Sequence, residues 1–296
     1  MNNKKNFLTV LMRMRNENLF LESFIKHYFA EGVDEIHILD DNSTQPFPKI
    51  LQDDRVFVYE ATAFKSHHEK LHDSQMLYNH LLRDKTEWFM FVDADEFITT
   101  RRNPNKTIRE ELETTFKDAD LIKIPWIMFG SNGQDENPKQ VLTDTIWRWN
   151  HDKKHPHPKE AMKIWKHRCC KYDKIEVKSI FKTEAFAKLT THCPSNPTRE
   201  INIVDGVDNI QNYMNEPETE IWYHNLREES IDRAYLACNH YRNISKEQMR
   251  QKADDSHLPL YRVENCYELQ LQSDFSEKKD EFLKNKAIGR KYYENN

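Results

Sequence analysis

Residues 88–98 read WFMFVDADEFI, an apolar run that ends in the carboxylates Asp93, Asp95 and Glu96. Two ionised carboxylates about 5 Å apart repel each other by roughly 3 kcal/mol at an effective dielectric constant near 20. Some feature of the protein must therefore make this concentration of negative charge tolerable or useful. The same stretch completes a pattern of strands and helices that determines the fold.

Residues 1–100 alternate between short apolar runs and helical patterns. Strands are predicted at 7–12, 35–39, 56–59 and 88–92, and helices over 18–32 and through 75–84. In the first helix Phe20, Phe24 and Tyr28 share one stripe, and Gly32 suits the end of the helix. The order β-α-β-β-α-β is typical of an α/β fold with a mostly parallel sheet.

Charged and polar clusters follow three of these strands. They are RMRNE (13–17), DDNS (40–43) and DADE (93–96). Because the carboxyl ends of parallel strands lie at one edge of the sheet, where ligands of open α/β sheets bind, the three clusters are expected to converge there. An N-cap and a turn are the alternative for the first two clusters, and a turn is a serious alternative for Asn42 and Ser43. Adjacent carboxylates at Asp40 and Asp41 are harder to explain without a donor partner.

The remainder of the chain is less regular. TIREELETTF begins with a capping-box pattern at Thr107 and Glu110, which predicts a helix. Strands are predicted at 121–129, 146–149, 178–181, 201–204 and 220–224, and helices over 230–241 and from 276 onward. Glycine is rare, so Gly130 and Gly133 in one loop suggest a required bend of the backbone.

Composition restricts the class of protein. The formal net charge is −5, from 44 Lys plus Arg and 49 Asp plus Glu, which does not indicate a general nucleic-acid binder. No apolar stretch is long enough for a signal peptide or a membrane span. The five cysteines (169, 170, 193, 238 and 266) follow no framework spacing and are interpreted as reduced thiols. A cytoplasmic protein is therefore expected.

The spacing of Asp93 and Asp95 indicates a metal site. In an extended segment alternate side chains point to the same side, so the two carboxylates would converge. Hard, oxygen-rich coordination of this kind suits Mg²⁺ or Mn²⁺, which can hold a diphosphate on its far side. The alternative is a strand end at which Asp95 caps a following helix.

The segments 10–44, 75–82 and 88–98 together resemble the glycosyltransferase family 2-like group with the GT-A fold, and more narrowly glycosyltransferase family 92. The later stretches IPWIMFGSNG, THCP and NHYRNIS are similar to further motifs of that family, in the same order. The resemblance covers about residues 7 to 255. It implies one GT-A-like catalytic domain over 1–245, with a nucleotide-binding half about 1–100 and an acceptor half about 101–245. Residues 246–296 would be a C-terminal helical extension.

The resemblance also implies roles for individual residues. The nucleotide would be held by Arg13, Arg15, Glu17, Asp41 and Asp93. Among these, the Asp41 carboxylate would accept the uracil N–H. In such enzymes the last Asp of the DXD motif, here Asp95, coordinates the metal, and the first, here Asp93, lies near both the ribose and the metal.

Histidines lie in two of the later motifs and in one insertion. His192 or His240 could add an imidazole to the metal or bind a phosphate oxygen, and His240 is the predicted third ligand, although a lone His is more often structural. The stretch 151–170 also offers zinc ligands, namely His155, His157, His167 and Cys169. Their spacing matches no common zinc module, so a solvated loop is favoured.

The implied function is a metal-dependent glycosyltransferase of the hexosyltransferase class. It would move a sugar from a UDP-linked donor to a glycan or other hydroxyl acceptor, with inversion. Inversion needs a general base, for which the loop GSNGQDENP offers Asp135, then Glu136, with Asp144 third. A surface turn whose acids face water is the alternative for that loop.

Two other classes stay open. A phosphatase of the haloacid dehalogenase type also carries a DxD motif, but its pattern needs Thr or Val where this chain has Phe97, and here the motif sits mid-chain. A non-catalytic sugar-binding module would keep the fold without turnover. The chain has no Gly-rich phosphate fingerprint, so kinases and dinucleotide-binding dehydrogenases are set aside.

Overall fold

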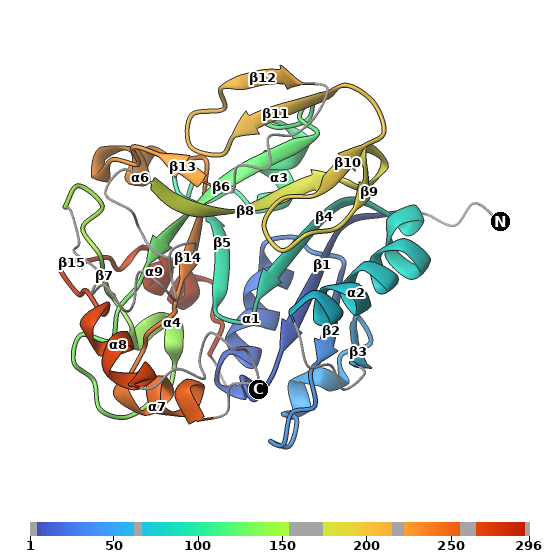
Figure 1. The fold of residues 1–296 in the computed structure, drawn as a ribbon. Helices are drawn as coiled ribbons and strands as arrows, with labels where there is room; N and C mark the ends of the chain where they lie inside the picture. The colour runs from blue at the N-terminus through green and yellow to red at the C-terminus, as the bar shows by residue number, and fades with distance from the viewer. Residues whose placement is uncertain (1–4, 62–66, 154–173, 215–221, 255–264, 294–296) are drawn as a thin grey trace.

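The computed structural model describes residues 5–61, 67–153, 174–214, 222–254 and 265–293. Its N-terminal part is a parallel α/β unit (Figure 1). The strands of this unit are β1 (Asn6–Met14), β2 (Glu35–Asp40), β3 (Val56–Glu60) and β4 (Thr86–Asp93), and its helices are α1 (Asn18–Ala30) and α2 (His67–Leu77). β1 pairs in parallel with β2 and β4, and β2 pairs in parallel with β3. The predicted order of strands and helices is confirmed.

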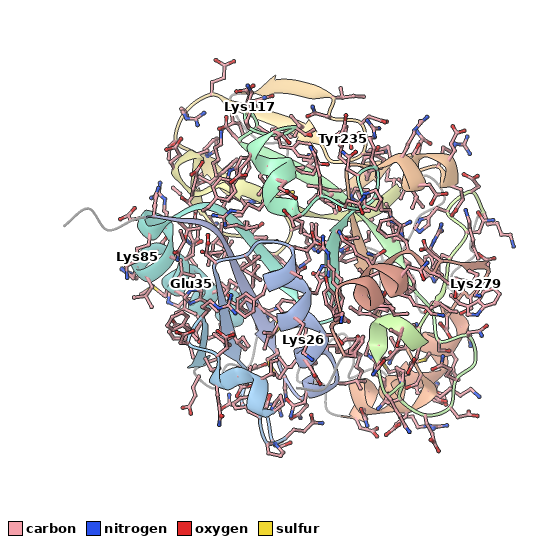
Figure 2. The ribbon with its side chains drawn as sticks, turned by 180° about the vertical axis from the view of Figure 1, so that it is seen from behind. Lys26, Glu35, Lys85, Lys117, Tyr235 and Lys279 are labelled. Atoms are coloured by element: carbon pink, nitrogen blue, oxygen red, sulfur yellow. The ribbon has the colours of Figure 1, made fainter. Side chains whose placement is uncertain are left out.

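Both faces of this sheet are covered. Along β1, Leu8, Val10 and Met12 pack into one core with the apolar stripe of α1, whereas Leu11 packs into a second core with Tyr78, just after α2. Figure 2 shows the face that α1 covers, with Lys26 on its outer side, and α2 lies on the opposite face in Figure 1. A central strand buried on both sides reads as a continuous apolar run, which is the pattern that the sequence shows.

The rest of the sheet is mixed. The strand order is β12-β11-β6-β8-β4-β1-β2-β3. Outside this order, β14 pairs with the last part of β6, and β5 pairs with β14. The additional strands are β5 (Glu96–Thr100), β6 (Leu121–Met128), β8 (Lys174–Lys182), β11 (Ile201–Asp205), β12 (Gln211–Met214), β13 (Trp222–His224) and β14 (Leu236–His240). β8 runs antiparallel between β4 and β6 and so joins the two halves of the sheet.

Small elements complete the fold. Two short ribbons are formed by β7 (Trp147–Arg148) with β15 (Lys278–Lys279) and by β9 (Phe186–Lys188) with β10 (Ser195–Pro197). The other α-helices in the described part of the chain are α3 (Ile108–Glu113), α4 (Val141–Asp144), α6 (Glu228–Arg233), α7 (Lys246–Asp254), α8 (Cys266–Gln272) and α9 (Phe282–Gly289). α3 begins at the predicted capping box of Thr107 and Glu110. The helix predicted from residue 276 is wrong in its first part, which forms β15.

The helix predicted over 230–241 is also wrong in its second half. α6 ends at Arg233, and 236–240 form β14, which pairs antiparallel with β5 and parallel with β6. All five residues of β14 are buried. A segment that fills a slot between two strands gains ladder hydrogen bonds and burial on both faces, and this tertiary gain outweighs a local helical pattern.

The DAD motif differs from the expected extended geometry. β4 ends at Asp93, Ala94 and Asp95 form a turn, and β5 begins at Glu96. The two aspartates therefore do not alternate along one strand. The turn places Asp95 between the parallel half of the sheet and the pair formed by β5 and β14.

Other expectations concern single residues. Gly133 has a φ of +75°, and a Cβ at Gly130 would lie 2.6 Å from the carbonyl oxygen of Phe275, so the loop needs both glycines. Cys193, Cys238 and Cys266 are buried free thiols, and Cys169 and Cys170 lie outside the described residues. In the part of the chain that the structure describes, no helix is long and apolar enough to cross a membrane.

Candidate functional site

The charged clusters after β1, β2 and β4 meet at one edge of the sheet. Arg13 pairs in register with Asp93 across β1 and β4, and Met14 pairs with Asp40 across β1 and β2. The predicted convergence of the three clusters is therefore confirmed. Figure 1 shows α7 near this edge, at the bottom of the view.

The loops after β1 and β2 are joined by hydrogen bonds. The Arg15 guanidinium donates to the carbonyl oxygens of Asp41 and Asn42, at 2.7 and 2.9 Å. The Asn16 side-chain oxygen accepts from the backbone N–H of Thr44 at 2.8 Å. Both Asn16 and Asn42 have a positive φ, which asparagine tolerates better than most residues. Arg15 and Asn16 thus fix the loop that carries Asp41.

The two adjacent aspartates of this loop differ. The Asp40 carboxylate accepts from the Ser43 hydroxyl at 2.5 Å and from the Ser43 backbone N–H at 3.2 Å, which is a local turn. The turn predicted as the alternative for Ser43 is therefore present. Asp41 is also buried, at 6% exposure, beside the loop that Arg13 begins. Its backbone carbonyl oxygen accepts from the Arg15 guanidinium, so the position of Asp41 is fixed.

Asp93 is paired with a lysine that sequence reasoning missed. The Lys178 ammonium on β8 lies 3.1 Å from Asp93 Oδ2 and 3.0 Å from Glu96 Oε2, and it donates to the carbonyl oxygen of Thr191. Burial alone would raise the pKa of Asp93, but the positive charges of Lys178 and Arg13 outweigh it and hold that pKa below its usual range. Asp93 therefore stays ionised.

Asp95 is paired with a second lysine. The Lys252 ammonium on α7 lies 2.8 Å from Asp95 Oδ2, and His240 Nε2 lies 3.5 Å from Asp95 Oδ1. Against the effect of burial, Lys252 and His240 hold the pKa of Asp95 far below its usual range. Burial lowers the pKa of His240, and the Asp95 charge only partly opposes this effect.

The remaining carboxyls of the site behave differently. Burial, followed by the charge of Asp95, raises the pKa of Glu17 to about 8. Burial also raises the pKa of Glu96 well above its usual range, and Glu96 Oε2 accepts the backbone N–H of Asp93 at 2.7 Å. Two ionised aspartates thus face two ammonium groups, which is how the chain tolerates the crowded acidic motif.

The predicted metal ligands do not form a closed site. Within the described ranges, no group of three or more His, Cys, Asp or Glu side chains is placed to hold a metal ion. The types of these residues nevertheless suit a hard divalent cation, because Asp93 is partly exposed and Asp95 already binds a positive charge, the ammonium of Lys252. The role of Asp93, Asp95 and His240 as metal ligands stays a prediction.

Aromatic rings line the side of the site toward β6 and β14. The ring centroids of Trp126 and His240 lie 4.4 Å apart, and those of Trp126 and His192 lie 5.6 Å apart. His192 Nδ1 lies 2.9 Å from the carbonyl oxygen of Val177, so Nδ1 carries the hydrogen. Trp126 Nε1 and His240 Nδ1 are buried without a hydrogen-bond partner among the described residues, which makes this wall a candidate contact for a polar ligand.

The predicted base lies away from these groups. The Asp135 carboxylate is 78% exposed and pairs with Lys246, the first residue of α7, at 2.7 Å. Lys252 is six residues further along the same helix, which corresponds to about 9 Å at 1.5 Å per residue. Glu136 and Asp144 are exposed as well. Of the proposed zinc ligands, His155, His157, His167 and Cys169 lie outside the described residues.

Sequence reasoning missed Lys178, Lys252 and Trp126. For Lys178 a signal exists, because it interrupts the apolar strand KIEVKSIFK, and a lysine on a strand buried on both faces needs an anionic partner. For Lys252 no local signal exists, since a lysine in a charged helix usually faces water.

Comparison with known proteins identifies the family of this chain. The model of glycosyltransferase family 92 matches residues 15–280. No curated protein matches the sequence. Among solved structures, the crystal structure of HddC from Yersinia pseudotuberculosis aligns with a TM-score of 0.29 and 9% identity, over 46% of this chain and 66% of that chain. That likeness is too distant to support any inference.

Proposed function

The chain belongs to glycosyltransferase family 92, and from that membership we propose that it transfers a hexosyl group from a UDP-linked sugar to a hydroxyl of a glycan or glycoconjugate. A transferase of this family needs a sugar donor and an acceptor. We further propose the GT-A fold and a relation to the family 2-like group. The parallel unit from β1 to β4, with its polar carboxyl edge, supports both.

One observation carries the proposal. On one side of Asp93 and Asp95 lie the parallel strands β1, which carries Arg13, and β2, which Asp41 follows. On the other side lie β6 and β14, which carry Trp126 and His240 of the aromatic wall. A nucleotide over β1 and β2 would extend its diphosphate toward the two aspartates, and its sugar would then lie toward Trp126. Arg13, Arg15, Glu17 and Asp41 are the proposed contacts to uridine, together with Asp93.

We propose Mn²⁺ or Mg²⁺ as the cofactor, held by Asp93, Asp95 and His240. When bound, the ion would stabilise the negative charge that develops on the departing diphosphate. The chain's own part is to hold ionised carboxylates beside the donor: Lys178 keeps Asp93 charged and oriented through its contacts with Glu96 and the carbonyl of Thr191. The buried free thiols support a reducing compartment such as the cytoplasm.

The proposed reaction inverts the anomeric centre. The acceptor oxygen forms a bond to the anomeric carbon while the bond from that carbon to the diphosphate oxygen breaks, and the electron pair leaves with the diphosphate. A base of the chain takes the proton from the acceptor hydroxyl. Asp135 remains the proposed base, although its pairing with Lys246 lowers its pKa and so weakens it as a proton acceptor.

The metal proposal is tested by calorimetry of uridine diphosphate. We expect the parent protein to bind it at least about tenfold more tightly with Mn²⁺ than with a chelator, and Asp95→Asn to lose that difference while it stays folded. Asp144→Asn is the matched control, because Asp144 is an exposed carboxylate on α4. Equal affinity of the parent protein with and without metal contradicts the role assigned to the ion.

The base is tested by kinetics once a donor and an acceptor are identified by screening nucleotide sugars. Asp135→Asn should lower kcat by about a hundredfold and leave nucleotide affinity unchanged. A variant with near-parental kcat moves the base elsewhere, and a product of retained configuration removes the need for it. Turnover of a UDP-sugar also separates the enzyme from a non-catalytic sugar-binding module, and release of phosphate from a simple phosphate ester would instead indicate a phosphatase.

A further inference from the structure

Lys252 occupies the place at Asp95 where a metal would be expected. Its ammonium lies 2.8 Å from Asp95 Oδ2 and donates to the carbonyl oxygen of Arg242 at 3.1 Å. The Lys252 side chain is 19% exposed, whereas that of Asp95 is 7% exposed. The cation is thus the more accessible member of this pair, and the carboxylate is the more buried one.

The kind of residue at this position is informative. A lysine is a compact charge on a flexible side chain of four carbons, and its three donors can change partners. An arginine would hold the carboxylate through two parallel hydrogen bonds and would be harder to displace. Asp95 needs a cation at all times, because an ionised carboxylate that is buried without one is costly.

We propose that Lys252 is a resident cation that holds Asp95 while no metal is bound and passes to the diphosphate of the donor when metal and nucleotide bind. This proposal rests on the function proposed above. A divalent ion and an ammonium group repel each other when both lie against one carboxylate, so they compete for Asp95. A diphosphate brings new negative charge to the same place and offers the displaced ammonium a partner.

Removal of the Lys252 charge should change the affinities for the metal and for the nucleotide in opposite directions. In Lys252→Met the competitor for Asp95 is gone, so Mn²⁺ alone should bind more tightly. If the ammonium occupies Asp95 about nine-tenths of the time, the gain is about tenfold. The same variant lacks a charged donor to the diphosphate, so uridine diphosphate should bind at least about tenfold more weakly at saturating Mn²⁺.

The experiment measures these two affinities separately. Binding of Mn²⁺ without nucleotide is followed by the electron paramagnetic resonance signal of the free ion, and binding of uridine diphosphate at saturating Mn²⁺ by calorimetry. Lys246→Met is the matched control, because Lys246 lies on the same helix and pairs with the exposed Asp135. We expect the control to match the parent protein in both measurements.

A second variant keeps the test decisive if Lys252→Met does not fold. In Lys252→Arg the guanidinium can bind Asp95 through two hydrogen bonds, so Mn²⁺ alone should bind several-fold more weakly than to the parent protein. A purely structural role for Lys252 predicts instead that Lys252→Met weakens both ligands and that Lys252→Arg restores both.

The outcomes separate this inference from the proposed function. If the parent protein binds Mn²⁺ and uridine diphosphate but Lys252→Met binds Mn²⁺ no more tightly, the role of Lys252 is overturned and the glycosyltransferase assignment stands. If the parent protein binds neither ligand, the proposed donor and cofactor are wrong, and the role of Lys252 falls with them. Tighter Mn²⁺ together with weaker nucleotide supports both proposals.

Discussion

Two buried groups of opposite charges lie in this fold, one around Arg148 and one around Asp95. All three nitrogens of the Arg148 guanidinium donate: Nε to Asp280 at 2.7 Å, and Nη1 and Nη2 to the two carboxylate oxygens of Glu228 at 2.8 and 2.9 Å. Its residue exposure is 1%. This group joins β7, α6 and the segment before α9, and every nitrogen of the Arg148 guanidinium donates to a partner within it.

The group around Asp95 is built differently. Lys178 and Lys252 pair with its two aspartates, and it retains buried polar atoms without partners in the described structure, such as His240 Nδ1 and Trp126 Nε1. One of its carboxyls, Glu17, has a pKa raised to about 8. An arginine that donates from every nitrogen to buried carboxylates and carbonyls stabilises the fold. Lysine pairs beside polar atoms that lack hydrogen-bond partners indicate instead a site at which a ligand can replace one member of a pair.

The largest effect is expected from Arg148→Met. Removal of the guanidinium leaves Glu228 and Asp280 buried with only part of their positive partners, and breaking a buried ion pair in this way costs about 3–5 kcal/mol. Urea unfolding should show this loss in the free energy of unfolding. Nucleotide affinity, measured where the variant is folded, should not change, because Arg148 contacts none of the site residues described above.

A smaller loss of stability, which also arises from the buried ion pairs of Arg148, is expected at low pH. Although burial alone would raise them, nearby cations hold the pKa of both Glu228 and Asp280 at about 2, against ordinary values of 4.5 and 3.8. A lowered pKa in the folded state stabilises the protein above the ordinary value, and that contribution is lost as pH falls through the folded value. Stability should therefore fall between about pH 4.5 and pH 2, and less steeply in Arg148→Met. The free energy of unfolding of both proteins is measured with urea at several pH values. The same pH dependence in both would mean that other groups cause the acid sensitivity.

A third prediction concerns a residue of the site whose substitution should leave the fold unchanged. Asp41→Ala should weaken uridine nucleotides by about 1–3 kcal/mol, the cost of one lost hydrogen bond to a charged group. The melting temperature of the variant without ligand should stay close to that of the parent protein, because Arg15 holds this loop through backbone carbonyls. Calorimetry with uridine and adenosine diphosphates checks the assignment, since only the uridine nucleotide should lose affinity.

The sequence predicts part of the group around Asp95 but nothing of the group around Arg148, because it predicts features that are encoded within short stretches of the chain. β1, α1, β2 and β4 follow from apolar runs and stripes within short windows, and the convergence of Arg13, Asp41 and Asp93 follows from parallel pairing. By contrast, Lys178 lies 85 residues from Asp93, and Lys252 lies 157 residues from Asp95. No local pattern encodes contacts of that separation.

The errors in secondary structure have a similar cause. β14 resembles a helix in sequence but fills the slot between β5 and β6, and the turn at Ala94 exists because β5 leaves β4 to pair with β14. Both depend on partners that lie far along the chain. The Arg148 group was not predicted for the same reason, since Glu228 and Asp280 are 80 and 132 residues away.

The smallest effect is expected from Lys246→Met, which tests whether α7 owes its position to surface charge. The pair of Lys246 and Asp135 is short, at 2.7 Å, but the two side chains are 35% and 78% exposed. Water and salt screen an exposed pair, and ordering two flexible side chains offsets its attraction. The melting temperature should therefore stay within about 1 °C of the parent value at low and at high salt. Because Lys246 and Lys252 lie on one helix, a clear loss of stability in Lys246→Met would mean that surface charge positions α7. Lys252 would then be held at Asp95 by that helix, and the contrast between the exchangeable lysine and the fixed Arg148 would disappear.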